Sequence, residues 1–298
     1  MKRTLHIYLH SPLRGNAEAG RVNIFNRMQS ALPDWWMVFV PDTEAERLRA
    51  ATRDHNLFHM VEPNGANTLC LRRAYYYPFW RIEATNERWN FDVAKASFDP
   101  AQVPPDAARA FLERWRPKIF RAGPVSREGF IYVPLQGRIS DHRSFQSMSP
   151  LAMIETVLQQ DDRRQVRATL HPNEIYSGQD IAALSNLQHR FPRFQLVQLD
   201  AKDLLGACDY VVTQNSSVAL TGYFAGKGAV LFAGIDFHHI AGSVKRDGVA
   251  AAFETTRHPL PDFAAYLWWF FKAHCINGGS PEAEEQISAR LRRHGWLT

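Results

Sequence analysis

The chain has 298 residues, of which 45% are hydrophobic, enough to build the cores of one large domain or of two lobes. Its formal net charge of +5 is mild, so charge alone does not indicate a nucleic-acid partner. The start lacks the apolar run of a secretory signal, and no stretch approaches the roughly 20 apolar residues of a membrane span. The three widely spaced cysteines form no Cys-x-x-Cys pair, so we expect reduced thiols in a cytoplasmic protein.

The first part of the chain alternates strand and helix patterns. Two strands and three helices are predicted there: strands Leu5–Leu9 and Met37–Val40, and helices Arg21–Leu32, Glu44–Ala51 (capped by Asp42-Thr43) and Pro105–Phe120. Residues 61–104 are irregular and rich in aromatic residues, which favours a packed connection. The cluster Tyr75–Trp80 within it is interpreted as core in preference to a sugar-stacking surface. We place the lobe boundary in the basic stretch Arg121–Glu128.

After this boundary the alternation restarts and continues to a final pair of helices. The predicted strands are Phe130–Leu135, Gln165–Leu170, Gln195–Leu199, Tyr210–Thr213 and Ala229–Phe232, and the predicted helices are Pro150–Gln159, Gln179–Arg190, Ala201–Cys208, Ser217–Ala225, Asp262–His274 and Ser280–His294. Strands separated by such helices form parallel β-α-β units. The predicted fold class is therefore α/β with two Rossmann-like lobes, divided into residues 1–125, 126–258 and 259–298.

Polar residues follow four predicted strands of the second lobe, at the ends where doubly wound sheets bind ligands. Asn215-Ser216-Ser217 opens a helix, whose free amides favour a phosphate, although a serine there also serves as a plain N-cap. His171-Pro172 can donate to a phosphoryl oxygen, or be structural. Asp141, after Gln136, can act as general base or nucleophile, or cap a turn. His238-His239 are interpreted as a substrate-facing loop and not as a metal site.

In the first lobe, the segment His10–Gly15 follows the first strand and contains Arg14. It lacks the Gly-x-Gly-x-x-Gly fingerprint, which argues against a dinucleotide. We interpret it as an acceptor-side loop, with His10 and Arg14 as further cleft candidates.

Taken together, these motifs resemble the capsular polysaccharide synthesis family of GT-B glycosyltransferases, which includes bacterial Kdo transferases. The resemblance rests on Pro134-Leu135-Gln136 with Asp141, on His171-Pro172, on Asn215-Ser216-Ser217-Val218 and on Gly226-Lys227. The His-Pro and Ser-Ser pairs are also similar to motifs of bacterial sialyltransferases. Two positions depart from the usual pattern, Ala168-Thr169-Leu170 without a lysine and Ala219 in place of a glycine, and both bear on the identity of the donor.

The resemblance implies roles for these residues. His171, Pro172, Asn215, Ser216 and Ser217 would hold the phosphate of a CMP donor. Asp141 would be the catalytic carboxylate, with His171 assisting, and Glu174 would reach the ribose. The last helices would cross back to the first lobe, which favours an interlobe contact for Tyr266–Phe271 over a peripheral membrane anchor.

The predicted function is transfer of an acidic sugar, of Kdo or sialic-acid type, from a CMP donor to a glycan or lipid-linked acceptor. We expect no essential metal and no cofactor, because histidine and helix-terminal donors can stabilise the departing phosphate. No nucleic-acid partner is expected, and the predicted location is the cytoplasm, including the inner face of the membrane. Two alternatives remain: a nucleotide-sugar epimerase or hydrolase on the same fold, and a non-catalytic glycan- or nucleotide-binding homologue.

Overall fold

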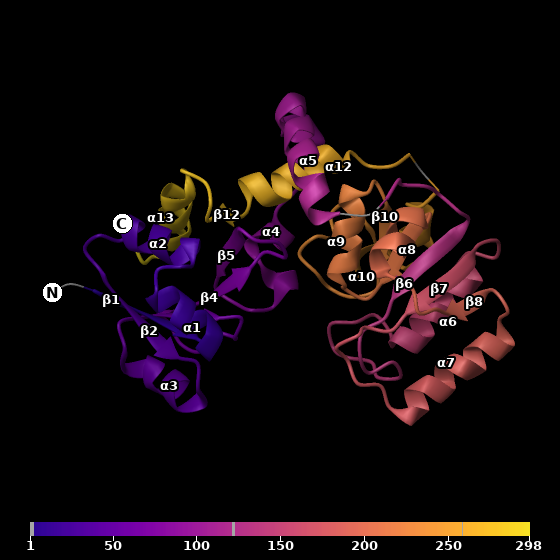
Figure 1. Ribbon diagram of the computed structural model, residues 1–298, viewed down its shortest axis with the longest axis horizontal. Coiled ribbons are helices and arrows are strands. Elements are labelled where there is room, and N and C mark those ends of the chain that lie inside the picture. Colours follow the sequence, from indigo (N-terminus) through magenta and orange to yellow (C-terminus); the bar gives the residue numbers. More distant parts are fainter. Residues whose placement is uncertain (1–2, 121–122, 258) are drawn as a thin grey trace. The chain divides into compact units, whose positions relative to one another are not determined.

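The computed structural model describes residues 3–120, 123–257 and 259–298 and divides into two compact units. Arg121 and Ala122, where the predicted linker begins, and His258, where the predicted second lobe ends, lie outside the described residues. The first unit comprises Met1–Ala96 and Trp269–Thr298, and the second comprises Ser97–Trp268. Each unit contains one six-stranded sheet with helices around it (Figure 1).

The sheet of the first unit has the strand order β12-β5-β4-β3-β1-β2. Its strands are β1 (Thr4–Leu9), β2 (Trp36–Pro41), β3 (His55–His59), β4 (Thr68–Arg73), β5 (Phe79–Glu83) and β12 (Ile276–Asn277). The strands β1 to β4 are parallel, while β5 is antiparallel to both β4 and β12. The chain runs from β1 to β2 on one side and returns to β3 on the other, so the topological switch point lies between β1 and β3.

Helices cover this sheet because their apolar residues recur on one face. They are α1 (Ser11–Glu18), α2 (Asn23–Ala31), α3 (Glu44–Leu48), α4 (Asp92–Lys95) and α13 (Ala283–Arg293), with short turns η1 (Arg49–Thr52), η2 (Arg88–Asn90) and the π-helical η4 (Trp269–Ala273). Ile24, Phe25 and Met28 of α2 are fully buried in a core that they share with Ile287 and Leu291 of α13. Figure 1 shows α13 beside α2, so the C-terminal segment completes the first unit as predicted.

The sheet of the second unit is entirely parallel, with the order β11-β10-β9-β6-β7-β8. Its strands are β6 (Phe130–Pro134), β7 (Gln165–Thr169), β8 (Phe194–Leu196), β9 (Tyr210–Thr213), β10 (Gly228–Leu231) and β11 (Gly242–Ser243). β6 and β9 are neighbours, and the chain leaves them in opposite directions across the sheet. The predicted doubly wound fold is confirmed, and its switch point lies between β6 and β9.

Some of the helices of the second unit begin at a side-chain cap. They are α5 (Pro105–Ile119), α6 (Pro150–Gln160), α7 (Gly178–Arg190), α8 (Ala201–Ala207), α9 (Ser217–Phe224), α10 (Val244–Asp247), α11 (Val249–Glu254) and α12 (Phe263–Trp268), with the short turn η3 (Pro100–Gln102). Ser149 caps α6, Asp200 caps α8, and Ser177 forms a reciprocal capping box with Asp180 at α7. These caps fix the places where the loops from the strands end.

Three parts of the first unit differ from the sequence prediction, and the first is the strand β3, which was not predicted. The segment His10–Gly15 is not a loop, because α1 begins at Ser11 with Pro12 in its first turn, where its missing N–H costs nothing. Residues 61–104 are not only a connection, since they contain β4 and β5. β5 is buried along its whole length although it carries Arg81 and Glu83. The Arg81 guanidinium donates to the His274 carbonyl oxygen at 2.9 Å, and such charges break the apolar pattern of a buried strand.

The compact units also group the chain differently from the predicted boundaries. α5 packs against α12 and α9, so it belongs to the second unit, whereas residues 269–298 belong to the first (Figure 1). Tyr266, Phe270 and Phe271 are fully buried, and therefore offer no apolar surface to a membrane. Among the described residues, no helix has both the length and the apolar character needed to cross a bilayer.

Candidate functional site

The candidate site of the second unit lies at the carboxyl edge of its sheet. Loops after β6, β7, β9 and β10 meet there, as predicted for parallel strands. The Thr213 hydroxyl donates to the Pro134 carbonyl oxygen at 3.2 Å and ties the end of β9 to the end of β6. The Gln214 side-chain amide donates to the Met148 carbonyl oxygen at 3.1 Å and holds the long β6 loop over the same edge. Gln136 is half-buried directly after β6, next to the switch point.

Ser216 is the N-cap of α9. Its hydroxyl oxygen accepts from the Val218 amide at 3.3 Å, and the side chain is buried. The capping interpretation is therefore correct, but it uses one lone pair and leaves the O–H as a donor. Ser217 is exposed in the first turn, and Asn215 is half-buried before it. The helix start thus presents the exposed Ser217 hydroxyl and the positive end of the helix dipole at the switch point.

His171 is held in a turn by hydrogen bonds of its amide and of one ring nitrogen. Its amide donates to the Tyr176 hydroxyl at 2.7 Å, and its Nδ1 accepts from the Asn173 amide at 3.2 Å. Because Nδ1 is an acceptor, the hydrogen of the neutral ring is assigned to Nε2. The side chain is half-exposed, so Nε2 is a donor available to a ligand.

The loops after β6 and β7 contact each other through Glu174 and Gly137. A Cβ atom added to Gly137 would lie 2.8 Å from the Glu174 Oε2, and the Gly137 φ angle is +35°. The positive φ favours glycine at this position, whereas the exposed Glu174 side chain can move away from an added Cβ. The exposed carboxylate of Glu174 therefore lies near the end of β6. Its contact with a ribose stays a prediction.

Asp141 is exposed in the β6 loop. Its carboxylate lies 3.8 Å from the Arg138 guanidinium, and its amide donates to the Arg138 carbonyl oxygen at 3.3 Å. The turn that carries it is fixed by Asp180, which accepts from the amide and the hydroxyl of Ser140 at 3.2 and 3.1 Å. Asp141 is therefore available to a ligand on an anchored turn.

Strand spacing sets how these residues act together. His171 follows β7 and Ser216 follows β9, with β6 between them, so their strands are about 10 Å apart. A ligand that contacts both must lie across the end of β6, beside Gln136. A nucleotide with an attached sugar has this extent.

His238 follows β10 at the same edge and stacks on His239 with ring centroids 4.3 Å apart. The His239 Nδ1 is 3.0 Å from the Tyr266 hydroxyl, and Arg246 donates to the His238 carbonyl oxygen at 3.3 Å. Both histidines are thus engaged in packing and hydrogen bonds. Within residues 3–120, 123–257 and 259–298, no three His, Cys, Asp or Glu side chains gather in a metal-binding arrangement.

The first-lobe candidates belong to the other unit. His10 is the exposed N-cap residue of α1 and makes no side-chain capping bond, and Arg14 pairs with Glu18 at 3.4 Å. His10 stacks on His59 at the end of β3, with ring centroids 5.7 Å apart. This pair spans the switch point of the first sheet.

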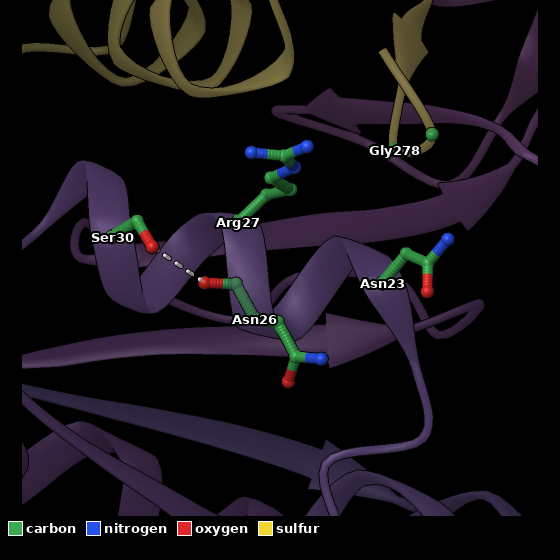
Figure 2. Close-up of a pocket in the computed structure, with 6 residues that line it drawn as sticks. Asn23, Asn26, Arg27, Ser30 and Gly278 are labelled. Atoms are coloured by element: carbon green, nitrogen blue, oxygen red, sulfur yellow. Dashed lines mark hydrogen bonds between the residues drawn. The ribbon is translucent and has the colours of Figure 1, made fainter. Parts of the chain in front are cut away.

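A polar cavity of about 350 Å³ also lies on the first unit, beside α2 and the turn after β12. Figure 2 shows the side chains of Asn23 and Arg27 on the side of α2 that faces Gly278, while the Asn26 amide is directed away. The Arg27 guanidinium is already paired with Glu284 at 2.9 Å. The cavity therefore offers amide and hydroxyl groups but no unpaired cation.

Comparison with known proteins finds relatives by structure alone. A scan of protein-family models gives no match, and a search of curated proteins gives none either. The chain is similar to the solved structure of Thermosulfurimonas dismutans KpsC, beta Kdo 2,7 transferase, with 13% identity, 98% of this chain and 99% of that chain covered, and a TM-score of 0.52. The chain has a GT-B-like fold. It is also similar to the beta Kdo 2,4 transferase of KpsC from the same organism, with 10% identity, 89% of each chain covered and a TM-score of 0.47.

Three residues that shape this GT-B-like chain were not predicted from the sequence. Asp180 is distant in sequence from the loop that it anchors, and only the fold brings it to Ser140. His59 and Arg73 lie at the ends of β3 and β4, which the sequence pattern did not reveal. By contrast, Lys227 was named from the sequence as part of the Gly226-Lys227 pair. It is fully buried directly before β10 and donates to the Cys208 carbonyl oxygen at 2.6 Å, so it is structural.

Proposed function

We propose that the chain is a glycosyltransferase that moves an acidic sugar of Kdo or sialic-acid type from a CMP donor to a glycan or lipid-linked acceptor in surface polysaccharide synthesis, in the cytoplasm. The observation that carries the proposal is the pair of donors on either side of β6, the His171 Nε2 and the start of α9 at Ser216-Ser217. The GT-B-like fold supports it, because these donors lie at the switch point of its second sheet.

In the proposed reaction, the bond between the anomeric carbon and the phosphate oxygen breaks and the phosphate of CMP takes the electron pair. His171, the Ser216 and Ser217 hydroxyls and the positive end of the α9 dipole stabilise the departing phosphate without a metal. Asp141 either removes the proton of the acceptor hydroxyl or attacks the anomeric carbon to form a covalent intermediate. Its exposure leaves the carboxylate accessible for either role.

The first experiment measures binding of CMP, UMP and GDP by calorimetry. Ser217→Asp is the sharpest variant, because an acidic residue in the first turn stabilises α9 but repels a phosphate at the same place. We expect CMP to bind in preference to UMP and GDP, and its Kd to rise about tenfold or more in Ser217→Asp and in His171→Ala. Ser149→Ala, which removes the N-cap of α6 in the same unit, is the control and should bind CMP normally.

Measuring turnover distinguishes the transferase proposal from a non-catalytic binding protein. Hydrolysis of a CMP-linked acidic sugar should be lost in Asp141→Asn while its CMP affinity is kept. CMP binding without turnover in the wild type would favour the non-catalytic homologue. Absence of binding by any of the three nucleotides would reject the nucleotide site itself, and preference for UMP or GDP would reject the CMP donor.

A further inference from the structure

The first unit gathers three basic side chains at the carboxyl edge of its sheet. His10 follows β1, His59 is the last residue of β3 and Arg73 is the last residue of β4. These three strands are adjacent and parallel, in the order β4-β3-β1, so their carboxyl ends lie side by side. The switch point between β1 and β3 lies within this group, and parallel sheets bind ligands at such points.

Ring contacts hold the three side chains as one cluster. The His10 and His59 rings stack at 5.7 Å, and the His59 ring lies 6.3 Å from that of Trp80. The Arg73 guanidinium lies 5.8 Å from the centre of the same Trp80 ring. Trp80 is buried in the core and therefore positions both basic groups.

The cluster has no acidic partner. In the part of the chain that the structure describes, the side chains of His10, His59 and Arg73 form no ion pair and no hydrogen bond, while Arg14 and Arg53 of the same unit are both paired with glutamates. Burial lowers the pKa of His59 to about 4, and the charges that act on it, from His10, Arg73 and Arg72, are all positive. The side chains of His10 and Arg73 are exposed at this edge. Basic groups that have no carboxylate partner there favour the binding of an anion.

We propose that His10, His59 and Arg73 form a binding site for an anionic group, a carboxylate or a phosphoryl group, on the ligand of the first unit. Arg73 supplies a permanent charge and donors for two oxygens. His10 and His59 supply ring N–H donors on either side of the switch point, and His10 also lies at the amino end of α1. Identifying that ligand as the sugar acceptor rests on the proposed transferase function, whereas the anion site does not.

The test uses the full chain with ¹⁵N-labelled histidine and no nucleotide. The probes are N-acetylneuraminic acid, its neutral methyl ester and methyl phosphate, and the His10 and His59 signals are assigned with His10→Gln and His59→Gln. We expect the acid, the phosphate or both to shift the two signals, and the ester not to do so. The tighter-binding anion then distinguishes an acidic sugar from a phosphate group as the recognised part.

Arginine variants provide the second readout. Arg73→Gln should raise the Kd of the anionic probe about tenfold or more, since a charge-assisted hydrogen bond is lost. Arg49→Gln is the matched control, because Arg49 is an exposed arginine of the same unit that precedes the amino end of β3. Equal shifts with the neutral ester, no shift with any probe, or an unchanged Kd in Arg73→Gln would overturn the site.

The outcome is independent of the nucleotide site. If CMP fails to bind while the anion still shifts His10 and His59, the anion site stands and the transferase proposal falls. If the wild type binds CMP and Ser217→Asp does not, but no anion shifts the His10 and His59 signals, the transferase proposal stands and the anion site falls.

Discussion

The loops after β6 and β7 meet where the Glu174 side chain lies against the backbone of Gly137. The added Cβ of Gly137→Ala would lie 2.8 Å from the Glu174 Oε2, and φ at this residue is +35°. We expect the substitution to lower the free energy of unfolding by about 1–2 kcal/mol, from backbone strain and from displacement of the Glu174 carboxylate. Urea unfolding measures this change.

A double-mutant cycle separates the two causes. In the background of Glu174→Ala, the clash is absent and only the backbone cost of Gly137→Ala, about 1 kcal/mol, should remain. If the two substitutions are fully additive, Glu174 does not restrict residue 137. Gly129→Ala is a control for positive φ alone, because Gly129 has a φ of +74° and nothing within 4 Å of an added Cβ.

At the scale of elements, the sequence predicts best where local chemistry decides. The strand Tyr210–Thr213 and the helix that begins at Ser217 were predicted at their observed starts, because an apolar run is followed by a serine cap. β5 was missed because its buried Arg81 and Glu83 depend on partners distant in sequence. The site loops follow predicted strands and could be placed from the sequence. The contacts between these loops could not be predicted, because they also join residues that are distant in sequence.

The capping box of α7 is the element that anchors the Asp141 turn. Burial raises the pKa of Asp180, but hydrogen bonds from Ser177 and Ser140 outweigh it and hold the pKa below its usual value. A carboxylate with a lowered folded-state pKa stabilises the fold above its unfolded pKa, and this contribution is lost as the pH falls through the folded pKa.

Asp180→Asn should therefore lower the free energy of unfolding at pH 7 by about 1–3 kcal/mol. The difference from wild type should shrink as the pH falls below about 4, because the wild-type carboxylate then becomes protonated as well. Urea titrations from pH 7 to pH 2.5 measure it. Asp203→Asn, at an exposed position in the first turn of α8, should change stability far less. A pH-independent difference for Asp180→Asn would contradict the assignment.

At the scale of the whole molecule, the first unit is rich in histidines whose pKa is lowered by burial. Among the described residues of the first unit, burial lowers the pKa of five histidines: His6, His55, His59, His274 and His294. The pKa of His59 and that of His274 fall to about 4. In the described part of the chain, one ring nitrogen each of His6, His55 and His294 is buried without a hydrogen-bond partner, and protonation would place unpaired N–H groups there.

Acid should therefore destabilise the first unit before the second. These histidines stay neutral in the folded chain, while the unfolded chain binds protons as the pH falls below about 6.5, so stability decreases between pH 6.5 and pH 4. We expect a loss of about 2–5 kcal/mol for the first unit by pH 4.5, since each group contributes up to about 1.4 kcal/mol per pH unit and solvent screens part of it. Hydrogen exchange, corrected for intrinsic rates, should show the strands β1, β3 and β4 opening at a higher pH than β6, β7 and β9 as the solution is acidified.

Two variants test the histidine explanation. His274→Phe should weaken the pH dependence of stability, and His189→Gln, at an exposed position, should leave it unchanged. Opening of both units at the same pH would refute the explanation.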